Sequence, residues 1–174
     1  GAVCANALKA AGYVVTPIDV QRDMGALMTR LYPKPHAVFN ALHGRYGEDG
    51  CVQGLLDILA IPYTHSGLLA SAIAMDKPTA TRLFALAGIP VAEHVLASPD
   101  EILAGDLLPR PYVVKPANEG SSVGVQIIRN GDNGPVINEG MAGESQMMVE
   151  AFIPGRELTV AVTVSYTHLR AHET

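Results

Sequence analysis

Cysteine is scarce in this sequence, which has only Cys4 and Cys51 among its 174 residues. Two cysteines are too few for a disulfide framework, and they do not form the close pair of a Cys-x-x-Cys motif. We therefore expect both to be ordinary reduced thiols, and no zinc site is indicated.

Clusters of lysine or arginine are also lacking, and the net charge is -5 with an isoelectric point near 5.6. This balance disfavours nucleic acids and anionic membranes as main partners, whereas a small metabolite fits it well. The longest apolar run, 68–75, is far shorter than the roughly 20 residues that a membrane-spanning helix needs. No charged-then-apolar segment opens the chain, so we expect cytoplasmic residence.

Hydrophobic residues, in contrast, make up 48% of the sequence, enough to bury one good core or two small ones. Helical and extended patterns alternate in the first half, which is typical of a parallel sheet flanked by helices. A strand-rich part follows, so we expect an α/β protein with domains at 1–88 and 89–164. Predicted helices cover 2–11, 52–60, 77–87 and part of 98–110, and predicted strands cover 13–18, 37–42, 91–96, 113–115, 123–128, 145–153 and 158–164.

A glycine- and serine-rich loop follows the predicted strand that ends at Lys115. Gly120, Ser121 and Ser122 would form its tight connection to the next strand. Glycine lets the backbone approach a ligand closely, hydroxyls add donors, and a nearby lysine supplies a point charge suited to phosphate oxygens. The loop therefore predicts a nucleoside triphosphate site. A simple hairpin turn with a solvated Lys115 is the alternative, because the P-loop and dinucleotide-binding glycine patterns are both absent.

Two further polar residues stand where a ligand could reach them. His43 follows the predicted strand 37–42, and ligands of open α/β sheets bind beyond the carboxyl ends of strands. Lys77 stands at the start of a helix capped by Asp76, where a cation opposes the helix dipole and an anionic ligand would relieve the conflict. A structural alternative remains open for each residue, namely a hydrogen-bonding role for His43 and a solvated side chain for Lys77.

Four strings in this order resemble the D-alanine:D-alanine ligases of the ATP-grasp superfamily. Several independent motifs at compatible spacing are far more specific than one, and the resemblance covers residues 1 to about 164. It implies an N-terminal open parallel α/β (pre-ATP-grasp) domain, followed by the start of an ATP-grasp α+β domain. The strings are Ala41-Leu42-His43-Gly44 with Gly47-Glu48-Asp49-Gly50, Met75-Asp76-Lys77, Val114-Lys115-Pro116, and Glu119-Gly120-Ser121-Ser122-Val123-Gly124.

The resemblance implies ATP-dependent joining of two D-alanines into the dipeptide used for bacterial peptidoglycan. One D-alanine carboxylate is phosphorylated, the amine of the second attacks the acyl phosphate, and phosphate leaves. The resemblance also implies Mg²⁺, with ligands expected beyond residue 164, and a homodimer of the full-length protein. No nucleic acid or membrane partner is implied.

The same resemblance assigns roles to residues at the matching motif positions. His43 would lie at the first D-alanine subsite, and Ser121 would help to line the catalytic centre. Lys77 and Lys115 would hold the phosphate groups of ATP, Ser122 and the glycine loop would close over them, and Glu119 would support that loop.

At the other end of the nucleotide, Glu150 would accept a hydrogen bond from the adenine amino group. The backbone of Ala151 and Ile153 would meet the ring edge, and Glu157 would bind the ribose hydroxyls. Without the resemblance, solvated strand carboxylates would explain Glu150 and Glu157.

Several parts of the family pattern are not found in this sequence. The glycine-rich segment with a substrate-binding glutamate would precede Gly1, and the mobile loop, the arginine and the magnesium ligands would follow Val164. We therefore expect a fragment that does not ligate alone, with residues 165–174 as a non-native tail.

Two alternatives to this function stay open. One is a ligase with a different second substrate, such as D-lactate or D-serine. The other is a noncatalytic ATP-binding module that keeps Lys77, Lys115 and Glu150 without the metal carboxylates.

Overall fold

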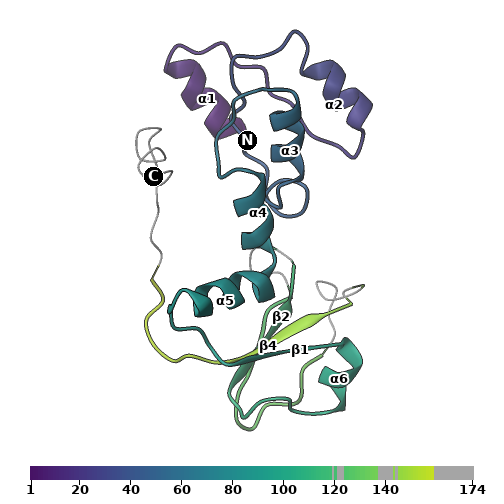
Figure 1. The fold of residues 1–174 in the computed structure, drawn as a ribbon, viewed down its shortest axis with the longest axis vertical. Coiled ribbons are helices and arrows are strands. Elements are labelled where there is room, and N and C mark those ends of the chain that lie inside the picture. The colour runs from purple at the N-terminus through teal and green to yellow at the C-terminus, as the bar shows by residue number, and fades with distance from the viewer. Residues whose placement is uncertain (119, 121–123, 137–142, 144, 159–174) are drawn as a thin grey trace.

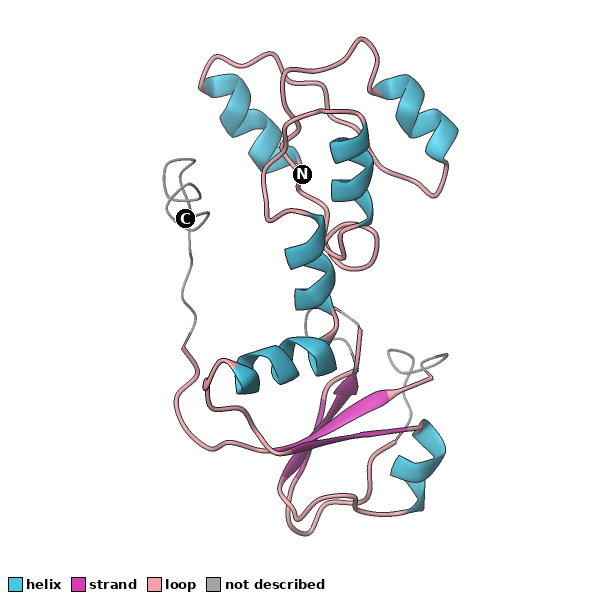
Figure 2. Cartoon of the chain, viewed as in Figure 1, coloured by secondary structure: helices cyan, strands magenta, loops and turns pink. Residues whose placement is uncertain are grey.

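The computed structural model describes residues 1–118, 120, 124–136, 143 and 145–158. The N-terminal part is helical, and it stands above a part that contains a sheet (Figure 1). The helices over residues 68–75 and 77–86 lie between the two parts. A short further helix, α6, lies beside the sheet (Figure 2). The helices are α1 (Ala2–Ala10), α2 (Met24–Arg30), α3 (Cys51–Ile58), α4 (Leu68–Met75), α5 (Lys77–Leu86) and α6 (Pro99–Ala104).

The predicted helices are present, and their ends follow local signals in the sequence. Asp76 is the N-cap of α5, where its side chain accepts a hydrogen bond from the Thr79 amide at 2.8 Å. The helix ends before Gly88, whose φ of +76° suits the left-handed position after a helix C-terminus. Ser98 and Glu101 form a complete capping box at the start of α6.

Parallel pairing in the N-terminal part is limited to one bridge, between Val38 and Tyr63. The predicted strand 37–42 is represented by this bridge, and the predicted strand 13–18 is coil with Val14 fully exposed. An extended segment becomes a strand only when a neighbouring strand accepts and donates its backbone hydrogen bonds. Among the described residues, segment 13–18 has no such neighbouring strand. Its apolar pattern alone was therefore not enough to make it a strand.

A small core holds the N-terminal helices together. Leu56 of α3 packs with Leu27 and Leu31 at α2 and with Ile61, and all four side chains are buried. The helix α2 was not predicted from the sequence, although Asp23 caps it by accepting a hydrogen bond from the Ala26 amide at 2.9 Å.

The second part is built on an antiparallel sheet with the strand order β1-β4-β2-β3. Alternate residues of these strands form one continuous core with Ile102 of α6, including Tyr112, Val114, Met147 and Val149. The four strands are close to the predicted ones and are β1 (His94–Ala97), β2 (Tyr112–Pro116), β3 (Gln126–Ile128) and β4 (Met147–Ala151).

The mixed α/β class predicted from the sequence is therefore confirmed in the described residues. Val123, at the start of a predicted strand, lies outside them, as does 159–164 of the last predicted strand. Strand alternation divides the sheet into two faces. The core face packs against α6, which leaves Val113 and Lys115 of β2 on the opposite face.

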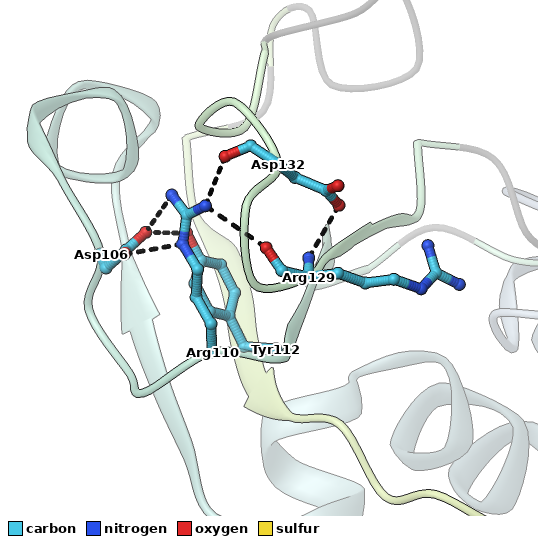
Figure 3. Close-up of polar contacts among 5 residues, drawn as sticks. All are labelled: Asp106, Arg110, Tyr112, Arg129 and Asp132. Atoms are coloured by element: carbon cyan, nitrogen blue, oxygen red, sulfur yellow. Dashed lines mark hydrogen bonds and ion pairs between the residues drawn. The ribbon is translucent and has the colours of Figure 1, made fainter.

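A polar cluster lies where β2 begins and β3 ends (Figure 3). Arg110 donates to both carboxylate oxygens of Asp106, at 2.8 and 3.0 Å, and its other nitrogen donates to the carbonyls of Arg129 and Asp132. The Tyr112 hydroxyl donates to Asp106 at 2.7 Å. Burial, followed by this bond, raises the pKa of Tyr112 to about 12. The cluster thus joins the turn before β2 to the turn after β3.

The Asp106 carboxyl gives this cluster a pH dependence. The hydrogen bond from Arg110, followed by that from Tyr112, lowers the pKa of Asp106 below its ordinary value of 3.8. Its stabilising contribution is therefore complete above pH 3.8 and is lost as the pH falls through the lower folded-state value. We expect Asp106→Asn to lower the melting temperature at neutral pH, with the difference from wild type shrinking in strong acid.

Thermal melts across pH check this expectation, with Asp100→Asn as the matched control, because Asp100 is an exposed carboxylate on α6. An equal deficit of Asp106→Asn at every pH would contradict the assignment.

Candidate functional site

An ion pair lies on the sheet face opposite the core. Lys115 of β2 and Glu150 of β4 contact each other through the lysine ammonium and one carboxylate oxygen. Lys115 is paired in register with Met148 and Val113 with Glu150, so the two charged residues are diagonal neighbours on the same face. Both side chains are about one-fifth exposed, at 23% and 20%. The face therefore carries a partly buried charge pair that solvent, or a ligand, can still reach.

Lys77 brings a second ammonium group close to this pair. Burial, followed by the charge of Lys77, lowers the pKa of Lys115 below its ordinary value. The Glu150 carboxylate is the ion-pair partner of Lys115. Lys77 and Lys115 thus place two ammonium groups within electrostatic range of each other, beside the Glu150 carboxylate that pairs with Lys115.

The start of α5 is tied directly to the end of β2. The backbone amide of Lys77 donates to the Ala117 carbonyl at 3.1 Å. The Asn118 side-chain amide, oriented to suit its neighbours, donates to Asp76 at 2.8 Å. These bonds hold Lys77 at the end of the strand that carries Lys115, although the two residues come from separate elements.

An open cleft of about 380 Å³ lies next to this junction. Its walls come from the loop 43–50, from the end of α4, and from the connections that follow β2 and precede β4. Arg45 and Asp49 of the loop are among the lining residues, so the cleft is lined by charges of both signs. Its lining residues are Arg45, Asp49, Ala72, Met75, Asp76, Asn118, Gly143 and Ser145.

The loop 43–50, which carries His43, is held by buried amide side chains. Asn40 and Gln53, both buried, donate to the Gly47 carbonyl, each at 3.1 Å. The Asn40 side chain also accepts from the Leu42 amide at 3.0 Å. The His43 side chain itself is exposed at the start of this loop. The loop is therefore anchored by buried hydrogen bonds, while the His43 side chain is exposed to solvent.

Asp49 fixes the other end of the same loop. Its two carboxylate oxygens accept hydrogen bonds from the amides of Tyr46 at 2.8 Å and Cys51 at 3.1 Å. Burial raises the pKa of Asp49, but these backbone hydrogen bonds outweigh burial, and the pKa lies below its ordinary value. Asp49 is thus a carboxylate at neutral pH, and it holds Tyr46 at a φ of +67° that is unusual for a tyrosine.

The structure brings some of the predicted site residues together and leaves others apart. Lys77, Lys115 and Glu150 form one charged group, and His43 lies on the separate loop 43–50, of which Arg45 and Asp49 line the cleft. The amide of Ala151 donates to the Glu93 carbonyl at 2.8 Å, so that N–H is already engaged. Ile153 and Glu157 lie in exposed coil after β4. Three predicted residues, Glu119, Ser121 and Ser122, lie outside the described residues.

Sequence reasoning missed the cleft-lining side chains. Arg45 and Asp49 lie inside the motif that singled out His43, and Asp76 was interpreted only as a helix cap. Asn118 precedes the glycine loop. Their positions beside motif residues were the available signal, but nothing in the spacing showed that four separate segments would meet around one cleft.

Neither a metal cluster nor a membrane helix is found in the described part of the chain. No group of three His, Cys, Asp or Glu side chains is close enough there to hold a metal ion. Among the same residues, no helix has both the length and the apolar character needed to cross a membrane.

Comparison with known protein families gives two matches along the chain. Residues 21–66 match the model of the D-ala D-ala ligase N-terminus, and residues 83–173 match that of the D-ala D-ala ligase C-terminus.

Individual relatives agree with these family matches. The chain is 53% identical to a D-alanine--D-alanine ligase of Acidiphilium cryptum, over 98% of this chain and 58% of the relative. It is 57% identical to one from Cereibacter sphaeroides, over 93% of this chain and 52% of the relative. The chain thus spans about half the length of the relatives it matches.

Solved structures show the same likeness. The D-alanine--D-alanine ligase of Bacillus anthracis superposes with a TM-score of 0.65 at 30% identity, covering 86% of this chain and 51% of that one. The VanG D-Ala:D-Ser ligase of Enterococcus faecalis gives a TM-score of 0.54 at 32% identity, covering 69% and 37%.

The loop 43–50 offers a direct test of its close packing. A Cβ atom added at Gly47 would lie 2.6 Å from Leu42 Cβ and 3.0 Å from the His43 amide nitrogen. We expect Gly47→Ala to cost about 1–3 kcal/mol of unfolding free energy, because this overpacking must displace the loop.

Denaturant unfolding measures this cost. Gly134→Ala is the control, since a Cβ atom there would meet nothing within 4 Å. Equal stability of the two variants would show that the loop packs less tightly than described.

Proposed function

This chain belongs to the D-alanine–D-alanine ligase family, and from that premise we propose that the protein joins two D-alanine molecules into D-alanyl-D-alanine with ATP. The observation that carries the proposal is the group formed by Lys77, Lys115 and Glu150 at the junction of α5 with the sheet. A binding module would need only such a group, whereas a ligase also needs an amino acid subsite nearby. The loop that carries His43 is placed to supply one.

The residues at this junction fit the phosphate groups of ATP. Two ammonium groups close enough for one to lower the pKa of the other are relieved when a polyanion lies between them. We propose that Lys77 and Lys115 bind the phosphates, with Glu119 and Ser122 in the adjoining loop. Phosphoryl transfer depends mainly on such positioning and charge neutralisation.

The nucleoside end would lie along β4 and the coil that follows it. Glu150 is one strand away from Lys115, which suits an acceptor for the adenine amino group next to a phosphate-binding lysine. Because the Ala151 amide already donates to Glu93, an adenine contact at Ala151 would use its carbonyl oxygen. Ile153 would contact the ring through its backbone, and Glu157 would bind the ribose.

ATP, when bound, supplies the phosphoryl group that converts one D-alanine carboxylate into an acyl phosphate. The exposed imidazole of His43 would bind and orient that D-alanine, and Ser121 would line the reacting centre. The amine of the second D-alanine then attacks the acyl carbon, the new amide bond forms, and inorganic phosphate leaves.

Magnesium belongs to this proposal, but the described residues do not form its site. Because no group of three His, Cys, Asp or Glu side chains that could hold a metal occurs among them, we assign none of the described residues to the ion. We place the metal ligands in sequence beyond residue 164, together with residues that select the second substrate.

The setting of the activity follows from its product. D-alanyl-D-alanine is a precursor of peptidoglycan, so we propose a role in cell-wall synthesis by a cytoplasmic homodimer. The division at residues 88 and 89 into a substrate-side domain and an ATP-grasp domain, with a tail at 165–174, is part of the same proposal.

The decisive assay incubates the complete purified protein with ATP, Mg²⁺ and D-alanine, and detects D-alanyl-D-alanine and ADP by chromatography. Because a D-Ala:D-Ser ligase is also similar in structure, parallel reactions add D-serine or D-lactate as a competing second substrate. ATP binding without any dipeptide or ester product would favour a noncatalytic module.

Lys115 provides a variant that separates binding from folding. We expect Lys115→Met to weaken ATP binding at least about tenfold, because a charged hydrogen bond to phosphate is lost. Isothermal titration calorimetry measures the affinity, and a thermal melt confirms that the fold is kept.

Two companion variants interpret the result. Lys34→Met removes an exposed lysine far along the chain and should bind ATP like the wild type. The double variant Lys115→Met/Glu150→Gln removes the carboxylate that would otherwise lose its partner. If it binds ATP as well as the wild type, Lys115 is not a phosphate ligand.

A further inference from the structure

The loop that carries His43 touches the segment that follows β2 through two glycines. A Cβ atom built on Gly120 would lie 3.5 Å from Gly44 Cα and 3.4 Å from a carboxylate oxygen of Glu48. Gly44 follows His43 directly and has a φ of +67°, which glycine adopts without strain. Two backbones therefore approach each other closely here, with one carboxylate beside the contact.

Glu48 holds its own side of this contact. Its carboxylate oxygen Oε2 accepts a hydrogen bond from the Gly44 amide at 2.8 Å. Its backbone amide donates in return to the Gly44 carbonyl at 2.9 Å. The two bonds close a turn over residues 44–48, and they fix the peptide that joins Gly44 to His43. The same Oε2 atom is the one that faces Gly120.

The Gly120 side of the contact leads to the lysines. Ala117, three residues earlier, accepts a hydrogen bond from the Lys77 amide at 3.1 Å, and Asn118 is bonded to Asp76 at 2.8 Å. Gly120 therefore lies two residues after a segment that is bonded to the start of α5 and that continues the strand carrying Lys115. Contiguous hydrogen bonds of this kind can carry coupling between two sites.

We propose that Glu48 is a positioning residue that couples amino acid binding beside His43 to ATP binding at Lys77 and Lys115. The inference rests on the function proposed above and adds cooperativity between its two substrates. A ligand on either side orders the contact between Gly44, Glu48 and Gly120. The second ligand then binds at a smaller cost in conformational entropy, because the contact is already ordered. Each ligand therefore raises the affinity for the other.

The Glu48 carboxylate makes a hydrogen bond that the turn itself does not need. A turn over 44–48 already has two backbone hydrogen bonds to the Gly44 carbonyl, from the amides of Gly47 and Glu48. The Glu48 side chain adds a hydrogen bond from the Gly44 amide, whose nitrogen belongs to the peptide bond between His43 and Gly44. Removal of the Glu48 carboxylate would therefore loosen the peptide bond between His43 and Gly44, while the backbone bonds keep the turn.

The test measures the affinity for a nonhydrolysable ATP analogue by calorimetry on the complete protein, with and without saturating D-alanine. In the wild type we expect D-alanine to raise the affinity about fivefold or more. Glu48→Ala should remove most of this effect, since its bond to Gly44 is gone. Glu48→Gln should restore it, because an amide oxygen can still accept from the Gly44 amide.

A second variant disturbs the contact without removing a hydrogen bond. Gly120→Ala places a methyl group against Gly44 and Glu48, and it should also reduce the effect of D-alanine. In the double variant Glu48→Ala/Gly120→Ala, the two losses should not add, because both act on one contact. Glu93→Gln changes an exposed glutamate and serves as the control.

The outcomes separate this inference from the proposed function. If the wild type binds both ligands with coupling and Glu48→Ala keeps that coupling, Glu48 has no such role even where it lowers stability. If the wild type binds the ligands independently, the inference fails while ligase activity can still be present. If the wild type forms no product and binds neither ligand, the proposed function fails and this inference fails with it.

Discussion

The junction between the start of α5 and the end of β2 is the constraint on which the site depends. The bond from the Lys77 amide to the Ala117 carbonyl and the bond from Asn118 to Asp76 join a helix N-terminus to a strand terminus. Because of this junction, Lys77 lies within electrostatic range of Lys115. Placing two cations together is unfavourable by itself, and such local conflicts are typical of sites that bind an oppositely charged ligand.

The sheet supports this junction by separating its two faces. The face that includes Tyr112 and Val114 is buried against α6, which gives β2 a rigid attachment. Lys115 and Glu150 stand on the opposite face, where the ion pair offsets part of their burial. The polar cluster around Arg110 lies at the start of β2, at the opposite end of that strand from Lys115.

Buried hydrogen bonds, rather than regular structure, hold the loop that carries His43. The loop 43–50 lacks regular structure, but the buried side chains of Asn40 and Gln53 both donate hydrogen bonds to its Gly47 carbonyl. A loop that is anchored in this way can present an exposed side chain such as His43 at a fixed place. The glycines at 44 and 120 then allow this loop and the segment that follows β2 to meet at backbone distance.

The sequence by itself determined the family, the helix α5 with its Asp76 cap, the antiparallel strands around the glycine loop, and the identity of Lys77 and Lys115 as site candidates. These features depend on motifs and on hydrogen bonds between residues a few positions apart, which spacing reveals. Only the tertiary structure decided that Lys115 pairs with Glu150, that Arg45 and Asp49 line a cleft with Asn118, and that Glu48 faces Gly120. It also reduced the expected parallel strands to one bridge. The physical reason is that strand register and loop contacts join distant segments, and no local pattern specifies which of those segments will meet.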